Sequence, residues 1–300
     1  MKDINKSLVV LVGQLACCFV AFFLPFSVSA QANLPLEQRQ IKDLRETLDM
    51  AFKSKDWPTA EEISRQLIKR PAANGFDFRR LARLLERQKK FAEAYELWVR
   101  AFEIDSDDKS LQGGLCWHWV QRNEPLKARS YCNRAAEIGN HYSNIVNLGH
   151  TYLLEDTANW EVQALQFYRD AVLKVKSLAD LTEGPLDDFD LFISNSWKVS
   201  ASKKYRTWFQ ESWPKLQAAI KAGKENIRLF NLGRSSDTLE PSRNAVRSYF
   251  EILGEDHPET LTSMNNLALT YSALGQQDRA LVLNEQTLKQ IGRASCRERV

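Results

Sequence analysis

The sequence predicts an all-α fold, a right-handed superhelical solenoid of antiparallel helix pairs. Three stretches, DWPTAEEISRQLIKRP, KFAEAYELWVRAFEID and EPLKARSYCNRAAEIG, align without gaps, which places Ala60, Ala94 and Ala128 34 residues apart. Upstream, FRRLARLL and QGGLCWHW align at the same period and match Leu81 with Leu115. A gapless period of this length, with apolar residues at helical spacing, indicates stacked units of two helices each.

Composition and charge agree with a folded array and argue against a nucleic-acid-binding protein. Apolar residues make up 44% of the 300 residues, which is enough for a continuous core. Residues 1–30 carry one net positive charge and residues 291–300 carry two, so the formal charge of +3 leaves residues 31–290 neutral. A neutral body has no basic field that would hold a phosphate backbone.

Residues 1–30 have the order of a secretory signal peptide. A short, weakly basic start, MKDINKS, precedes a long apolar run, and SVSA then supplies small residues. We expect cleavage after Ala30 and an exported protein, periplasmic or secreted. The alternative is an uncleaved membrane anchor, because residues 8–26 are nearly long enough to span a bilayer. The residues before Cys17 and Cys18 do not match a lipidation signal, and no second apolar run of spanning length follows.

Residues 31–178 are predicted to hold about four helix pairs, and their pattern resembles the tetratricopeptide repeat. That family favours small residues where the two helices meet and large ones around them. Residues 41–74 form a degenerate first unit, residues 109–142 match loosely, and a further unit starts near Tyr142. The best match, residues 75–108, supplies Phe78, Leu81, Ala82, Leu85, Ala94, Trp98 and Ala101.

Residues 179–240 change character. EGPLDDFDLFISNSW contains glycine, proline and three aspartates, which predicts an irregular connection. SKKYRTWFQESWPKLQAAIKAG after it is predicted to be helical but does not fit the repeat. Its candidate core residues are Trp208, Phe209, Trp213, Leu216 and Ile220.

Residues 241–290 resemble the repeat of kinesin light chains. Pro258 suits the first turn of a helix, with Asp256 or His257 as its cap. Leu267 and Ala268 match the seventh and eighth positions of that repeat, and Gly275 makes its turn.

The last ten residues, IGRASCRERV, break the pattern abruptly. Their codons can spell a common short-read sequencing adapter, so we interpret residues 291–300 as an assembly artefact and expect the natural protein to continue differently. The alternative is a native basic tail.

The sequence predicts no catalytic or metal site and no cofactor. The four histidines have no cysteine or carboxylate at metal-binding spacing, and no phosphate loop or nucleophile motif is present. We therefore expect a non-enzymatic scaffold that binds a protein or peptide. The alternative is the regulatory arm of a larger protein, for example one with a caspase-like protease domain, as the resemblance suggests.

The family resemblance also implies a peptide-binding groove. In tetratricopeptide repeats, positions 2, 5, 9, 12 and 13 of the first helix tend to line the concave face. An acidic, partly apolar peptide is the expected ligand, although a merely solvated face is the alternative for the arginines. The family's carboxylate-clamp residues are absent. The implied groove residues are Phe76, Arg79, Arg83, Arg87, Trp117, Val120, Gln121, Val146 and His150.

Cys116 and Cys132 occupy positions 8 and 24 of one repeat, which face each other when the chain turns near position 16. Export would place them in an oxidising compartment, where a disulfide persists. We expect a bond between them; the alternative is two small buried thiols.

Overall fold

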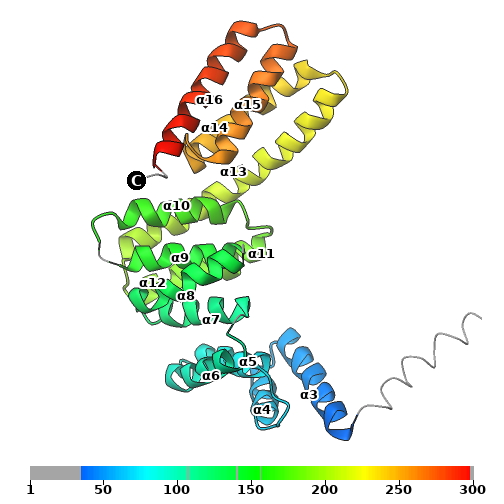
Figure 1. Cartoon of the computed structure of the whole chain (residues 1–300), viewed down its shortest axis with the longest axis vertical. Helices are drawn as coiled ribbons and strands as arrows, with labels where there is room; N and C mark the ends of the chain where they lie inside the picture. The colour runs from blue at the N-terminus through cyan, green and yellow to red at the C-terminus, as the bar shows by residue number, and fades with distance from the viewer. Residues whose placement is uncertain (1–34, 107, 140, 156, 298–300) are drawn as a thin grey trace, which may run out of the picture. The chain divides into compact units, whose positions relative to one another are not determined.

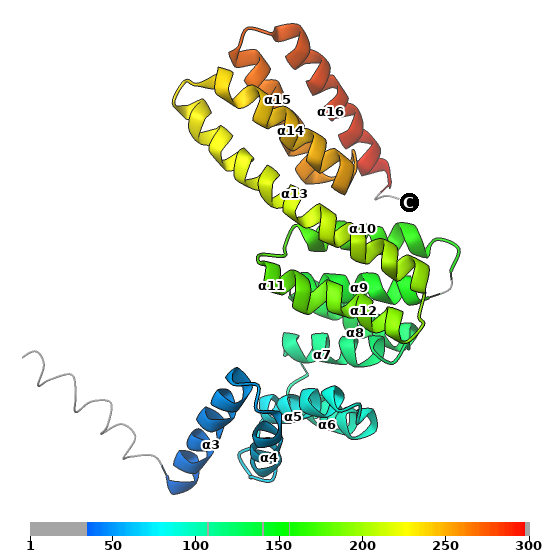
Figure 2. The same ribbon diagram turned by 180° about the vertical axis from the view of Figure 1, so that it is seen from behind.

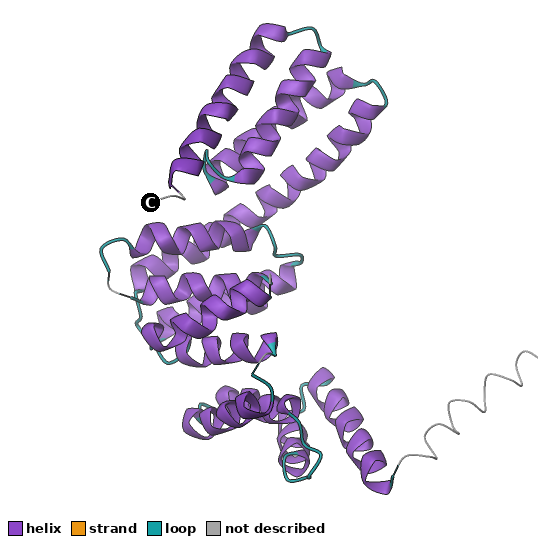
Figure 3. Ribbon diagram, in the orientation of Figure 1, coloured by secondary structure: helices purple, strands orange, loops and turns teal. Residues whose placement is uncertain are grey.

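The computed structural model describes residues 35–297 except residues 107, 140 and 156. The predicted signal peptide lies outside the described residues. Every regular element in the described part is helical, as Figure 3 shows, and the all-α prediction is confirmed. The chain divides into two units, one ending at Ser106 and one beginning at Asp107, a boundary that falls inside the array predicted for residues 31–178. Each unit is described by itself.

The first unit consists of two helix pairs. α3 (Leu36–Lys53) packs against α4 (Trp57–Leu67), and α5 (Gly75–Arg87) packs against α6 (Phe91–Ile104). Side-chain caps fix the helix starts: Asp56 accepts from the Thr59 N–H, and Asn74 and Asp77 cap each other's backbone reciprocally. The degenerate first repeat therefore forms a complete pair.

Small and large side chains interlock in the core of this unit. Ala60 and Ala94 are fully buried and let the helices approach closely, while the Trp98 ring fills the space beside them. The Trp98 indole donates to Glu86 Oε1 at 2.8 Å, so the buried N–H is satisfied. Buried Asp77 accepts two hydrogen bonds from Arg45, at 3.1 and 2.6 Å, which join α3 to α5.

The second unit begins with two further helix pairs. α7 (Lys109–Val120) packs against α8 (Pro125–Ile138), and α9 (Tyr142–Leu154) packs against α10 (Trp160–Val172). Ala128 and Ala164 are fully buried at the repeat's small positions. Gly149 is required where it stands, because a Cβ there would lie 2.5 Å from the Tyr168 ring.

Residues 178–231 are more regular than the sequence predicts. α11 (Leu178–Leu181), a π-helical turn (Thr182–Leu186) and α12 (Asp187–Ser194) follow one another, with a kink at Gly184. The long helix α13 (Val199–Asn231) comes next (Figures 1 and 2). Its first half contacts α12, where Arg206 pairs with Asp190, and its second half contacts α14, where Asn226 bonds Ser242. One helix thus belongs to two successive pairs.

The chain ends with three packed helices: α14 (Ser235–Leu253), α15 (Pro258–Ala273) and α16 (Gln277–Arg297). His257 caps α15 by accepting from the Glu259 N–H, and Gly275 adopts a φ of 73° in the turn before α16. α16 continues as a helix beyond Gln290, where the sequence changes, because Ile291 and the residues after it include no helix breaker except Gly292.

Candidate ligand-binding groove

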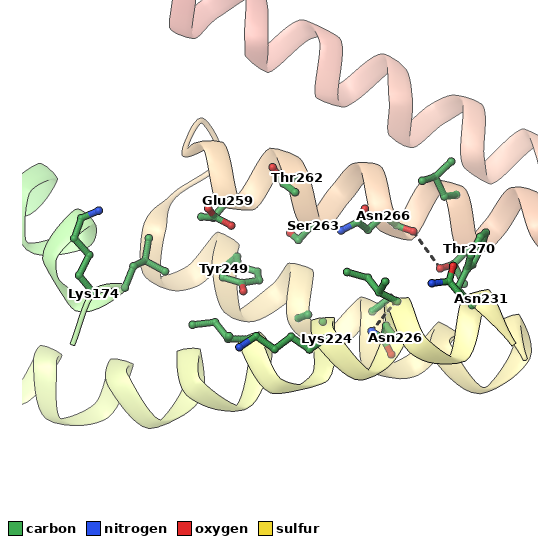
Figure 4. Close-up of a pocket in the computed structure, with 18 residues that line it drawn as sticks. Lys174, Lys224, Asn226, Asn231, Tyr249, Glu259, Thr262, Ser263, Asn266 and Thr270 are labelled. Atoms are coloured by element: carbon green, nitrogen blue, oxygen red, sulfur yellow. Dashed lines mark hydrogen bonds between the residues drawn. The ribbon is translucent and has the colours of Figure 1, made fainter. Parts of the chain in front are cut away.

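A groove of about 600 Å³ lies in the second unit between α13, α14 and α15, bounded at one end by Leu173 and Lys174, which directly follow α10 (Figure 4). Helical spacing creates its two walls, because side chains three or four residues apart share a helix face. On α13 these are Ile220, Lys224, Ile227 and Asn231, and on α15 they are Glu259, Thr262, Asn266 and Leu269. The floor comes from α14, which supplies Ser242, Ala245 and Tyr249.

Gly223 leaves the groove open along the α13 wall. A Cβ built at this position would meet no atom within 4 Å. The glycine lies inside a helix, where it lowers helix stability by about 1 kcal/mol relative to alanine. Its side of the groove therefore has room for part of a ligand.

Three asparagines line the groove, and two of them retain hydrogen-bonding capacity in their side-chain amides. The Asn226 amide donates to Ser242 Oγ at 3.1 Å. The side-chain amides of Asn231 and Asn266, in contrast, have no hydrogen-bond partner among the described residues. Each side-chain amide offers both a donor and an acceptor, the same pair that a peptide unit carries.

One end of the groove is apolar and exposed. Ile227 is 58% exposed, Phe230 40% and Leu269 52%, and all three line the groove. Large apolar side chains gathered at the rim of a concave site are typical of a surface that a ligand covers.

The nine residues implied by the family positions do not line this groove. Phe76, Arg79, Arg83 and Arg87 lie on α5 in the first unit, and the other five lie on α7 and α9 in the second. Phe76 is exposed and Arg79 is buried, with its guanidinium 5.0 Å from the Phe76 ring centre. Arg83 and Arg87 are exposed.

Three of the implied residues require a correction. Val120, Val146 and His150 are fully buried, so they offer no surface to a ligand in this structure, whereas Trp117 and Gln121 are partly exposed. α12 explains the burial of His150, because Phe189 and Phe192 pack on its ring at centroid distances of 5.0 and 4.8 Å. Residues 179–194, expected to be an irregular connection, therefore cover this helix face.

A partial signal for the groove is present in the sequence. With Leu267 at position 7 of the last repeat, Thr262 and Leu269 occupy positions 2 and 9, the same positions that were applied to the earlier repeats. The α13 wall has no such signal, because the repeat register cannot be assigned in a helix that runs through two pairs without a turn.

Buried polar groups form a second notable cluster in this unit. His150 Nδ1 lies 2.9 Å from the Tyr168 hydroxyl, and His150 Nε2 lies 3.2 Å from Asp188 Oδ2. Burial raises the pKa of Asp188, while the hydrogen bond from His150 acts in the opposite direction. Each of these groups is satisfied by another, so the cluster is a packed hydrogen-bonded network.

Cys116 and Cys132 form a disulfide in the structure, with their Cα atoms 4.8 Å apart. Both are fully buried between α7 and α8. Within the described residues, histidine, cysteine and acidic side chains do not gather into a group that could hold a metal ion. The described helices also include none that is long and apolar enough to cross a membrane.

The helix pairs define the described part of this molecule as a helical-repeat solenoid. Residues 229–290, which contain most of the groove, match the family model described as tetratricopeptide repeat. Residues 229–290 therefore carry tetratricopeptide repeats, a fold that suggests a scaffold for protein–protein interaction.

Several solved structures resemble the chain at low identity. The apo form of the quorum sensor NprR from B. thuringiensis is 12% identical, with a TM-score of 0.42, and the match covers 95% of this chain and 74% of that one. A tetratricopeptide repeat protein from Parabacteroides merdae is 17% identical, with a TM-score of 0.39 and coverage of 84% and 94%. TPR-like repeats of a putative kinesin light chain from Podosopora anserina are 17% identical, with a TM-score of 0.30 and coverage of 71% and 92%. No curated protein sequence matches the chain.

Proposed function

We propose that this chain is an exported interaction scaffold that binds a short, extended peptide segment of a partner protein in the α13–α14–α15 groove. The observation that supports it is the groove itself, a concave site of about 600 Å³ lined by unpaired amides and by exposed apolar side chains. This combination of apolar lining and a few polar groups suits a ligand-binding site.

The polar lining favours an extended segment over a helix. A helix has already paired its backbone groups, so Asn231 and Asn266 would gain little from it. An extended segment exposes its N–H and C=O groups, which the side-chain amides can pair with whatever the peptide sequence is. Recognition of the peptide's side chains then depends on the two ends of the groove.

Export is the part of the proposal supported by sequence alone. Its support is the basic, apolar and small-residue order of residues 1–30. An acidic ligand, as the sequence suggests, is compatible with the groove, because Lys174 and Lys224 line it against a single acid, Glu259.

Gly223 allows a test in which binding and stability change in opposite directions. Leucine at 223 would fill the open side of the groove and would also replace a glycine inside a helix. For a peptide selected from a random library, we expect Gly223→Leu to weaken binding roughly tenfold or more, a loss of about 1.4 kcal/mol. The melting temperature should rise, because leucine is the better helix former.

Gly223→Ala is the matched control. Alanine also stabilises the helix relative to glycine, but it adds only one carbon to the groove. This variant should therefore bind the selected peptide with the affinity of the wild type. If Gly223→Leu binds as well as Gly223→Ala, the peptide lies elsewhere and the assignment of this groove is wrong.

A further inference from the structure

The long helix α13 contains a proline near its centre, Pro214. Proline has no backbone N–H, so it gives no hydrogen bond to the carbonyl of Gln210, and its ring crowds that carbonyl. Sharp bends in helices occur at such positions. The two halves of α13, residues 199–213 and 215–231, therefore meet where the helix backbone is weakest.

The two halves of α13 pack on different helices, as Figures 1 and 2 show. In the first half, the Tyr205 hydroxyl donates to the Glu161 carbonyl of α10 at 3.4 Å, and the same half contacts α12. In the second half, the Asn226 amide donates to Ser242 of α14 at 3.1 Å. α15 packs on α14, and α16 packs on α15. Pro214 therefore lies between the helices up to α12 and the helices from α14 onward.

The weak point of α13 is held at one backbone carbonyl. The Trp213 indole and the Gln217 amide, on either side of Pro214, both donate to the carbonyl of buried Val175, at 2.9 and 3.2 Å. Val175 belongs to the link between α10 and α11, and residues 173–174, just before it, bound one end of the groove. These hydrogen bonds fix the position about which the two halves of α13 can change their angle.

The groove lies across this joint, because residues 173–174 are on the α10 side and its walls on α13 and α15 are on the other side. Contacts of α10 also cross the joint. The Arg169 guanidinium donates to the Ile252 carbonyl of α14 at 3.3 Å, and Asp170 lies 3.2 Å from Nε2 of His257, the cap of α15. The Asp170 side chain is 46% exposed, so water can replace this contact when the angle changes.

We propose that Pro214 is a hinge, and that a peptide bound in the groove closes α14, α15 and α16 toward residues 173–174. The inference rests on the proposed function and concerns how that site is regulated. A peptide that fills the groove touches both sides of the hinge, so it gains contacts as the angle narrows. A ligand that binds one conformation more tightly shifts the population toward it. The distance between α10 and α16 therefore reports whether peptide is bound.

The experiment measures the distance between two spin labels, at Gln166 on α10 and Asn284 on α16, which are both exposed. The protein is the exported chain from Gln31 with Cys296→Ser, in which the disulfide occupies the two remaining natural cysteines. The probe is the peptide selected from a random library. At saturation it should narrow the distance distribution and shift its mean by more than about 2 Å.

Pro214→Ala tests the hinge directly. Alanine supplies the missing N–H and removes the ring, so the two halves of α13 stay at one angle. This variant should lose the shift in label distance and bind the selected peptide several-fold more weakly. Pro241→Ala is the matched control, because Pro241 also lies inside a helix but on one side of the hinge, in α14. The control should keep the full shift.

The outcomes separate the hinge from the proposed function. If Gly223→Leu weakens binding but the label distance does not change with peptide, the hinge is wrong while the proposed function stands. The hinge is equally contradicted if Pro214→Ala keeps the shift or if Pro241→Ala loses it. If Gly223→Leu binds the peptide as well as Gly223→Ala, the proposed function is contradicted and this inference with it.

Discussion

Single side chains in the second unit show how burial decides what a polar residue can do. His150 occupies a position that lines the concave face in related repeats, yet here α12 covers it completely. Its ring accepts a hydrogen bond from the Tyr168 hydroxyl and donates one to the Asp188 carboxylate. Because these side chains satisfy one another's hydrogen bonds, a substitution of any one of them should change the free energy of unfolding.

Asp188 provides the first prediction. Burial raises the pKa of Asp188 above its ordinary value of 3.8, so the folded state binds a proton more tightly than the unfolded state does. The unfolding free energy of the wild type therefore falls as the pH rises from about 3.8 through the raised pKa of the folded state. Asp188→Asn keeps an acceptor for His150 without the charge. The unfolding free energy of this variant should equal that of the wild type in acid and exceed it at neutral pH. Chemical denaturation of both proteins at several pH values measures this difference.

Asp188→Ala is the companion variant. It leaves Nε2 of the buried His150 without its partner and should cost about 1–3 kcal/mol. Equal pH dependence in Asp188→Asn and wild type would contradict the account of Asp188.

Two glycines give the second prediction, with opposite signs for the same substitution. At Gly149 a Cβ would lie 2.5 Å from the fully buried Tyr168 ring, which has no room to move. Gly149→Ala should therefore lower the unfolding free energy by about 1–3 kcal/mol. At Gly223 the Cβ meets nothing, and Gly223→Ala should raise it by about 0.5–1 kcal/mol. Calorimetry of both variants checks the pair, and a shift in the same direction would refute the packing around Gly149.

At the level of helices, the 34-residue period predicted the pairs well wherever a turn separates them. Ala60, Ala94 and Ala128 are all fully buried, as the alignment implied. The period failed at α13 because KLQAAIKAG contains strong helix formers where a turn would be needed, so the backbone continues. The groove wall on α13 exists because the helix continues without a turn, and the local sequence pattern does not predict that continuation.

The disulfide supports α7, a helix that is weak by its own sequence. Gly113 and Gly114 lie inside it, and two interior glycines weaken a helix of this length. The disulfide between Cys116 and Cys132 ties α7 to α8 across a separation of 16 residues. The closure of a loop of this size stabilises the folded state by roughly 3 kcal/mol in the chain-entropy model.

The third prediction follows from this link. In a Cys296→Ser variant that is exported and begins at Gln31 after cleavage, the denatured, unreduced protein should show no free thiol. Reduction should lower the unfolding free energy by up to about 3 kcal/mol. A Cys116→Ala and Cys132→Ala variant should already be less stable and should not respond to reductant. Detection of two free thiols in the unreduced protein would contradict the bond.

At the level of the whole molecule, the two units each contain their own core, and the groove belongs entirely to the second. The residues implied as groove from family positions are divided between the units. Sequence could therefore predict the class of fold, whereas the acidic, partly apolar peptide ligand stays a prediction. It could not predict the groove, because the groove is formed by three helices, and one of them, α13, has no assignable repeat register.

The final prediction joins export to the disulfide. In a host with a secretory pathway, the full chain should leave the cytoplasm and lose residues 1–30, so that N-terminal sequencing starts at Gln31. The exported form should carry the bond between Cys116 and Cys132, because thiols oxidise there, whereas a chain lacking residues 1–30 should stay reduced in the cytoplasm. Substitution of both cysteines by alanine provides the control, since export should persist without them. An intact N-terminus on membrane-bound protein would instead establish the anchor, and the scaffold would then act at the membrane surface.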